Sequence, residues 1–346
     1  MKFPTSAFAL AICQPGMERA LKAEVGRARP DLRSAWSRPG IVTFRASGGV
    51  FRPDESVDAV FARRWACSGG SVASFELLLA HLDTLRPARV HLGPRDQGVP
   101  DEIPPARQAA ADSDARALSE RLAAARPELP QGPGGEDGCL ILDVITSPDE
   151  PPAIGWHVKA DESGPLGRWD YAVPDDLPSR AWRMVVEGLR WSRAPLLPGD
   201  RVLEIGAAPG GATRAFAEHG ARVLAVDPQP IDPAVRAMSG VTVVQRPIGE
   251  LRLEDVPDDV RWIASDAGIA PPHVVGAIRR ILPRVRGGLR GLLLTLKLND
   301  AAAIAGLPAV FAQLEALVGG RARACQLPAN RRDVFVYVAI EPSARP

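Results

Sequence analysis

Two ionisable side chains stand at the ends of apolar segments in the C-terminal half of the chain. Lys297 closes the run Leu292–Leu296, and Asp266 follows Ile263-Ala264-Ser265. A lysine in so apolar a segment is costly to bury unless it is paired or neutral. Of the 42 basic residues only four are lysines, and Lys297 is the one in the C-terminal half. Lysine can lose its proton in a protein and arginine cannot, which gives a chemical reason for a lysine here. The alternatives are a lysine reaching solvent and an Asp266 that caps a helix.

A glycine-rich turn follows another apolar segment, Val202–Ile205, and precedes a helical pattern. Glycines allow a ligand to approach the backbone, and the start of a helix offers unpaired N–H groups. The spacing is G-x-x-P-G-G, which departs from the G-x-G-x-x-G of dinucleotide enzymes. Asp227, at the end of the next apolar segment, is placed to accept hydrogen bonds from a ribose diol. The turn and the acid together predict an adenosine cofactor; the alternatives are a purely structural turn and a capping role for Asp227. The residues expected to bind it are Gly206, Ala207, Ala208, Pro209, Gly210, Gly211, Asp227, Asp266 and Ser179.

The elements that must position these residues alternate from Pro174 onward between strands rich in Val, Leu and Ile and helices. This alternation predicts an α/β domain with a parallel sheet, and ligands bind at the carboxyl edge of such sheets. The late strand 334–340 is expected to be antiparallel. Asp333, which follows Arg331-Arg332, would bring a further carboxylate to the same edge, or lie in a solvated turn. The other expected strands are residues 201–205, 222–226, 241–245, 262–265 and 292–298.

The N-terminal half predicts a small α+β region without a catalytic constellation. Residues 57–65 are expected to run from helix into strand, and residues 103–125 to be helical but broken by prolines. We expect domains at 1–70, 71–170 and 171–346, with the last boundary in the loop 164–176. The remaining elements are strands at 6–13, 41–45, 89–92, 139–146 and 153–159, with helices from Gly16 to Val25 and at 75–82.

The composition indicates an ordinary globular protein, 46% apolar and 24% charged. The four cysteines are widely spaced and lack metal-ligand spacing, which favours reduced thiols in the cytoplasm and no metal site. No apolar run approaches the ~20 residues of a membrane span. Residues 1–175 hold 20 Lys and Arg against 24 Asp and Glu, and residues 176–346 hold 22 against 17. This modestly basic C-terminal half permits an RNA partner.

Taken in order, these motifs resemble the FtsJ-like family of RNA ribose 2′-O-methyltransferases, which includes enzymes of large-subunit ribosomal RNA. The likeness runs nearly end to end: Cys13–Glu18 matches C-x-P-G-x-E, Phe61–Trp65 looks like F-A-R-Q-W with Arg64 at the glutamine position, and Leu296–Leu298 matches L-K-L. The resemblance implies a Rossmann-like methyltransferase domain that binds S-adenosyl-L-methionine. It also implies an N-terminal region with a THUMP-like RNA-binding module.

The resemblance also implies roles for individual residues. Lys297 would be the general base on a ribose 2′-hydroxyl, and Asp266 would position it. Asp333 stands where the family has a glutamate. The family's S-R-x-x-x-K-L helix begins here at Ser179, but Met184 stands at its lysine position, so Arg183, one residue earlier, is the candidate replacement. That shift turns the side chain by about 100° on a helix.

Three functions are therefore expected in order of preference. The first is an RNA 2′-O-methyltransferase acting on large-subunit ribosomal RNA. The second is a catalytically impaired RNA-binding protein, which Met184 at the lysine position suggests. The third is a methyltransferase with a non-RNA substrate. The sequence indicates neither the modified nucleotide nor the oligomeric state.

Overall fold

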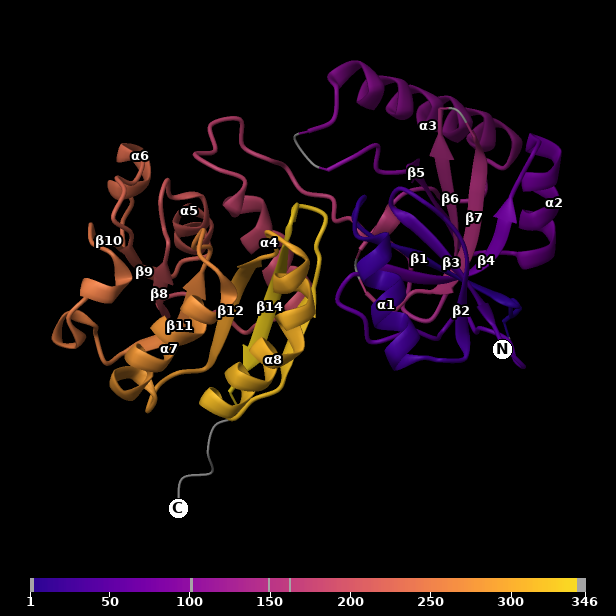
Figure 1. Ribbon diagram of the computed structural model, residues 1–346. Helices are drawn as coiled ribbons and strands as arrows, with labels where there is room; N and C mark the ends of the chain where they lie inside the picture. The colour runs from indigo at the N-terminus through magenta and orange to yellow at the C-terminus, as the bar shows by residue number, and fades with distance from the viewer. Residues whose placement is uncertain (1–2, 100–101, 149, 162, 341–346) are drawn as a thin grey trace. The chain divides into compact units, whose positions relative to one another are not determined.

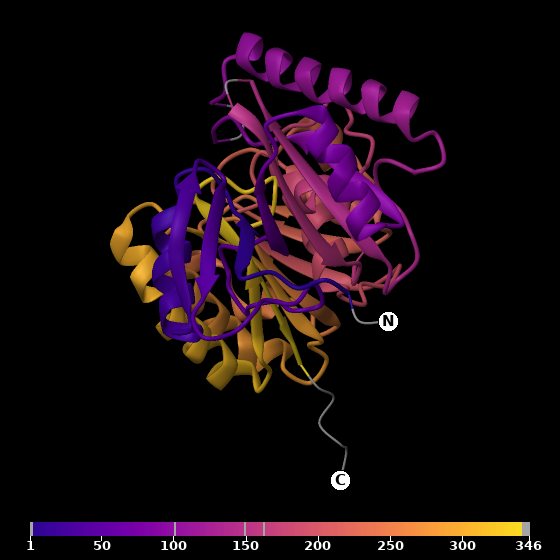
Figure 2. The ribbon, with the colours of Figure 1, turned by 90° about the vertical axis from the view of Figure 1, so that its right-hand side faces the viewer.

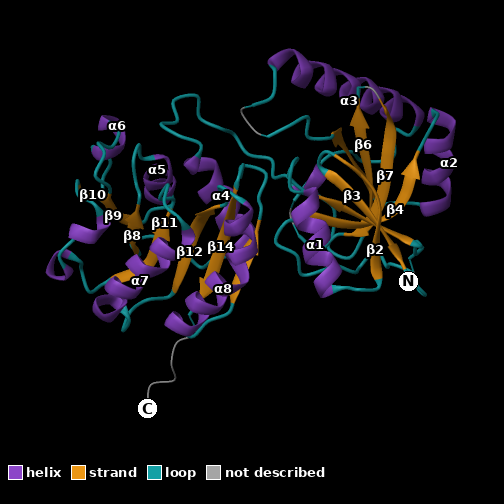
Figure 3. Cartoon of the chain, viewed as in Figure 1, coloured by secondary structure: helices purple, strands orange, loops and turns teal. Residues whose placement is uncertain are grey.

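The computed structural model describes residues 3–99, 102–148, 150–161 and 163–340. The chain divides into two compact units, Met1–Ala172 and Val173–Pro346, which are both visible in Figure 1. The division falls in the loop where the sequence analysis placed the start of the C-terminal domain. Figure 3 shows that each unit combines helices with its own sheet.

Unit 1 is built on one seven-stranded sheet in the order β2-β3-β1-β4-β7-β6-β5. Its strands pair antiparallel except for β5 and β6, which are parallel. The helix α3 packs on β5 and β6, and Arg121 of α3 lies over the ring of Phe75 of α2, so these two helices are neighbours (Figure 2). The elements are β1 (Phe8–Ile12), α1 (Glu18–Ala28), β2 (Leu32–Arg38), β3 (Ile41–Ala46), β4 (Arg64–Ser71), α2 (Phe75–Leu85), β5 (Arg89–Pro94), α3 (Pro105–Ala125), β6 (Leu140–Ser147), β7 (Glu150–Val158) and η1 (Pro165–Gly167).

Three expectations for this half need correction. The boundary expected at residue 70 falls inside β4, which pairs with β7, so residues 1–70 and 71–170 share one sheet. Residues 57–63 form no helix, because the Glu24 carboxylate accepts hydrogen bonds from the N–H groups of Val60 and Phe61 and fixes an irregular path. The helix α3 is unbroken, since its prolines stand at its first turn, where no N–H partner is lost.

Unit 2 is an α/β unit with the strand order β10-β9-β8-β11-β12-β14-β13. The strands β10, β9, β8, β11 and β12 are parallel, and β14 is antiparallel to both β12 and β13, which confirms the expected late reversal. In Figure 1, α7 and α8 cover the near face of this sheet, and α4 and α5 cover the far face. The elements are α4 (Ala181–Ser192), β8 (Arg201–Ile205), α5 (Gly211–Glu218), β9 (Arg222–Val226), α6 (Pro233–Arg236), β10 (Val241–Val244), η2 (Ile248–Glu250), η3 (Leu253–Asp255), β11 (Val260–Ser265), α7 (Pro271–Val285), β12 (Gly291–Lys297), α8 (Ala301–Val318), β13 (Ala322–Cys325) and β14 (Asp333–Ala339).

Buried aliphatic strands hold the edge of this sheet rigid. The strand β12 is buried from Gly291 to Leu296, and only Lys297 at its end is half-buried. In the centre, Trp262 of β11 is fully buried, and its indole N–H donates to Asp200 at 3.0 Å. Each fully buried large side chain contributes about 1.5–3 kcal/mol. The buried packing of β8, β11 and β12 therefore holds their carboxyl ends, and the residues that follow them, in place.

The helix α8 qualifies an expectation about apolar runs. It has 18 residues with a mean hydropathy of 1.7, and by length and composition alone it could cross a membrane. Only 17% of this helix is buried, and its buried residues are Leu307, Val310 and Leu314. None of the four cysteines forms a disulfide bond in the described residues.

Candidate active site

Three strand ends bring an amine and two carboxylates together. Lys297 ends β12, Asp266 follows the parallel neighbour β11, and Asp333 begins the antiparallel neighbour β14. Because β14 is reversed, its first residue pairs in register with the last residue of β12. Lys297 Nζ donates to Asp266 Oδ1 at 2.7 Å and to Asp333 Oδ2 at 3.4 Å. The convergence of Lys297, Asp266 and Asp333 expected from the sequence is what the fold produces.

A second cation joins these carboxylates from the start of α4. The guanidinium of Arg180 lies 3.5 Å from Asp333 Oδ2. The sequence analysis had assigned this role to Arg183, so the cation seen at the carboxylates is Arg180, and a role for Arg183 stays a prediction. Met184, at the family's lysine position, is buried, and Asn330 Nδ2 lies 3.3 Å from its sulfur.

The electrostatics of this cluster are close to balanced. The carboxylates of Asp266 and Asp333 face the cations of Lys297 and Arg180. Burial raises the pKa of Asp266 above its usual value, against the opposing effect of the Lys297 ammonium. The side chains of Lys297 and Asp266 are each 18% exposed, whereas that of Asp333 is 4% exposed. The amine is thus held between carboxylates and is still reachable by a bound molecule.

The glycine turn lies next to this cluster because β8 and β11 are adjacent strands. Gly206 has a φ of +78°, and a Cβ there would lie 2.6 Å from the Cβ of Ala267, so only glycine fits. A Cβ at Gly211 would lie 2.8 Å from the carbonyl oxygen of Ser179. Ser179 therefore packs against the first residue of α5, beside the turn.

Asp227 braces the turn from the end of β9. Its carboxylate accepts the N–H of Ala208 at 3.1 Å and that of Gln229 at 2.7 Å. Each carboxylate oxygen can accept more than one hydrogen bond, so both retain capacity for a ligand hydroxyl. The peptide bond between Ala208 and Pro209 is cis, and Gly210 (φ +116°) caps α5 without any side-chain bond to its first N–H groups.

A buried acid lies beneath the turn. Glu204 of β8 is 1% exposed, and burial raises its pKa to about 8. Its Oε2 accepts the hydroxyl of Thr213 at 2.6 Å, and its Oε1 has no hydrogen-bond partner among the described residues. A small cavity lined by Glu204, Asp266 and Thr295 adjoins this atom.

These features fit S-adenosyl-L-methionine. Gly206, without a Cβ, lets a ligand approach the turn closely. The start of α5 offers N–H donors for a carboxylate. The carboxylate of Asp227 offers acceptors for a ribose diol. Asp266 and Lys297 lie beside the turn, so a ligand bound at the turn would extend toward the Lys297 amine. Arg180 and Glu204 were missed by the sequence analysis, although an acid inside an apolar strand was a usable signal for Glu204.

Unit 1 holds a polar cluster that the sequence analysis did not anticipate. His91, Asp143 and His157 come from three neighbouring strands and are buried, with their ligand atoms within 4.8 Å of one another. Arg64 lies 3.0 Å from Nε2 of His157, and Nδ1 of the same ring lies 2.7 Å from Asp143. Because an arginine can only donate, Nε2 accepts and the ring proton is on Nδ1, facing Asp143. This arrangement is a hydrogen-bonded network whose tautomer leaves Nδ1 unable to bind a metal ion.

Comparison with known proteins places part of unit 2 within a known family match. Residues 186–310 match the FtsJ-like methyltransferase family. This match lies within unit 2, which has the α/β methyltransferase fold. The resemblance to the FtsJ-like methyltransferases that the motifs indicated is thereby confirmed.

The chain is also similar to a named curated protein, the ribosomal RNA large subunit methyltransferase M of Alkalilimnicola ehrlichii. The two are 31% identical over 144 residues, a match that covers 39% of this chain and 38% of the relative. The match therefore spans well under half the length of that relative.

Among solved structures, two methyltransferases with bound S-adenosylhomocysteine overlap this chain. The 1,6-didemethyltoxoflavin-N1-methyltransferase of Burkholderia thailandensis is 17% identical, with a TM-score of 0.37, and covers 47% of this chain and 79% of that one. The magnesium protoporphyrin IX methyltransferase of Synechocystis is 14% identical, with a TM-score of 0.33, and covers 49% and 89%. The fold of unit 2 is defined by its own strand order and by the family match.

Proposed function

We propose that the protein is an S-adenosyl-L-methionine-dependent methyltransferase that methylates a ribose 2′-hydroxyl of RNA, with large-subunit ribosomal RNA as its substrate. The observation that carries this proposal is the contact of Lys297 with Asp266 and Asp333 next to the glycine turn. The family match and the similarity to an enzyme of ribosomal RNA support the substrate class. The free cysteines support a cytoplasmic location.

The residues of the chain would act mainly by alignment and proton removal. S-adenosyl-L-methionine supplies an electrophilic methyl group on a sulfonium. Lys297, in its neutral form, would accept the proton of the ribose hydroxyl that attacks this methyl group. Asp266 holds the amine in line and stabilises the ammonium that results. Asp333, itself paired with Arg180, fixes the amine from the opposite side.

The test is methyl transfer from tritiated S-adenosyl-L-methionine into purified ribosomal RNA, with the product nucleoside identified by mass spectrometry. Lys297→Ala should lower the rate by about 10²–10⁴-fold, the usual contribution of a general base. The matched control is Lys159→Ala, because Lys159 belongs to unit 1 and pairs there with Asp137 at 2.8 Å. Undiminished transfer by Lys297→Ala would overturn the proposed mechanism.

The burial of Met184 favours one second candidate, a protein that binds RNA and cofactor without turnover. Arg180, at the arginine position of the S-R-x-x-x-K-L pattern, still supplies one cation to these carboxylates, which favours turnover. Any 2′-O-methylated nucleoside formed by the purified protein excludes this candidate. Arg180→Ala should slow transfer, because its guanidinium is the cation that pairs with Asp333.

A further inference from the structure

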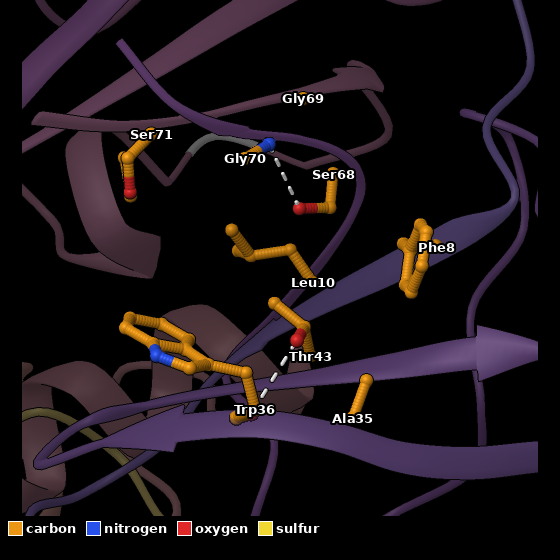
Figure 4. Close-up of a pocket in the computed structure, with 10 residues that line it drawn as sticks. Phe8, Leu10, Ala35, Trp36, Thr43, Ser68, Gly69, Gly70 and Ser71 are labelled. Carbon is orange, nitrogen blue, oxygen red and sulfur yellow. Dashed lines mark hydrogen bonds between the residues drawn. The ribbon is translucent and has the colours of Figure 1, made fainter. Parts of the chain in front are cut away.

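One face of the unit 1 sheet carries two exposed aromatic rings at the edges of a hollow. Phe8 of β1 is 39% exposed and Trp36 of β2 is 37% exposed. Figure 4 shows the two rings on opposite sides of the hollow, with the side chains of Leu10 and Thr43 between them. The hollow measures about 460 Å³, which is within the size range of small-molecule sites. Exposed rings that flank a hollow are suited to hold a flat apolar group.

The wall opposite Trp36 is built from polar backbone and hydroxyl groups. It consists of Ser68, Gly69, Gly70 and Ser71, at the point where β4 bulges against β7. A Cβ at Gly69 would lie 2.8 Å from the side chain of Ile154, and Gly70 has a φ of +79°, so this path of the strand requires glycine. The hollow therefore combines π-faces with hydrogen-bonding edges, which are the two features of a nucleobase.

Two arginines lie beside the hollow in a cross-strand pair. Arg33 of β2 is opposite Arg45 of β3, and Arg45 is opposite Phe8 of β1, so all three side chains share one face. Both arginines are exposed, and neither has an ion pair among the described residues. Like charges directly opposite one another are destabilising. A bound anion would relieve this repulsion.

Further charges support an anionic partner. Arg38 lies 5.1 Å from the centroid of the Trp36 ring, and its Nε pairs with Glu150 at 2.9 Å, so the ring is steadied by a cation. The segment 8–46, which contains β1 to β3, carries seven Lys and Arg against three Asp and Glu. This end of the sheet is thus basic, although the N-terminal half as a whole is slightly acidic.

We propose that this hollow binds one unpaired nucleobase of an RNA strand between Phe8 and Trp36, with a neighbouring phosphate on Arg33 and Arg45. The inference deepens the proposed function and rests on it for the identity of the RNA, since the hollow would hold a nucleotide of the substrate other than the methylated one. Stacking of a base on aromatic rings beside basic side chains is the usual mode of single-strand recognition.

The first test measures stacking with a ten-nucleotide single-stranded RNA that carries 2-aminopurine and a terminal fluorescein. Phe8→Ala and Trp36→Ala should each weaken binding about 10-fold by anisotropy and reduce 2-aminopurine quenching, because a stacked base is worth about 1–3 kcal/mol. Trp36→Phe keeps an aromatic face and should retain most of both signals. The matched control is Leu77→Ala, since Leu77 is an exposed apolar residue of α2.

The second test measures the phosphate contact through salt dependence. The double substitution of Arg33 and Arg45 by Ala should reduce the slope of log affinity against log salt by about 0.7 for each phosphate lost. Arg116→Ala, at an exposed arginine of α3, is the control and should leave the slope unchanged. Circular dichroism of each variant separates loss of binding from loss of folding.

The outcomes distinguish this proposal from the proposed function. If Lys297→Ala binds and quenches as the unsubstituted protein does, while Trp36→Ala does not, the nucleobase site is supported whether or not methyl transfer is found. If methyl transfer occurs but Phe8→Ala and Trp36→Ala change neither RNA binding nor quenching, the hollow is not an RNA site and the proposed function stands. A hollow that captures a peptide but no RNA overturns the proposal as well.

Discussion

Glu204 gives a prediction whose size can be worked out from its surroundings. The carboxyl is fully buried beside Thr213, and burial raises its pKa from 4.5 to about 8. In the unfolded chain the same group titrates near 4.3. Between these values the folded state holds a proton that the unfolded state has lost. The free energy of unfolding therefore falls as pH rises, by up to about 1.4 kcal/mol per pH unit from this one group.

Glu204→Gln keeps the shape and the acceptor for the Thr213 hydroxyl but cannot ionise. The variant should gain stability relative to the unsubstituted protein by about 2–3 kcal/mol between pH 5.5 and 7.5. Urea denaturation at several pH values measures this difference, and the transition that shifts on substitution reports unit 2. The control is Glu250→Gln, at an exposed acid of the same unit. A stability difference that is constant over this range would refute the assignment of Glu204 as a neutral buried acid.

Two further predictions concern packing and cofactor binding. Gly188→Ala should destabilise the protein by about 1–3 kcal/mol, because the added Cβ would lie 2.7 Å from Phe335 Cδ2, whereas Gly276→Ala, with open space around it, should be neutral or stabilising. Thermal denaturation compares the two, and equal effects would contradict the packing. Asp227→Asn should weaken S-adenosyl-L-methionine binding about 10–100-fold in calorimetry, because a charge-assisted hydrogen bond is worth about 1.5–3 kcal/mol. Unchanged affinity would show that Asp227 serves the turn alone.

The sheet of unit 2 could be predicted from sequence because its signals are local. The buried parallel strands are rich in aliphatic residues, as in Leu292–Leu296, and the polar residues Asp227 and Asp266 follow β9 and β11 at the sheet edge. The pairing of Lys297 with Asp266 then follows from strand adjacency. The strand β13 was missed because it is short and half-exposed, so it lacks an apolar run.

The errors have a common physical cause, which is that the decisive contacts are non-local. The strand β2 has a single buried residue, Leu32, and is a strand only because β3 pairs with it. Arg180 was overlooked in favour of Arg183, because helix spacing from Met184 says nothing about where Asp333 would lie. The network of His91, Asp143 and His157 joins the β6–β7 hairpin to β5, which is separated from β6 in the sequence by α3.

The reversal of β14 has a consequence for how the protein is made. The carboxylate of Asp333 reaches Lys297 only after the last strand has been inserted between β12 and β13. A ribosome-bound chain that has emerged only as far as residue 330 contains the amine, the turn and Asp266, but its β12 has an open edge and no partner at that end. Synthesis must therefore pass the final strand before Asp333 can pair with Lys297, and proteolytic loss of that strand would remove this pairing.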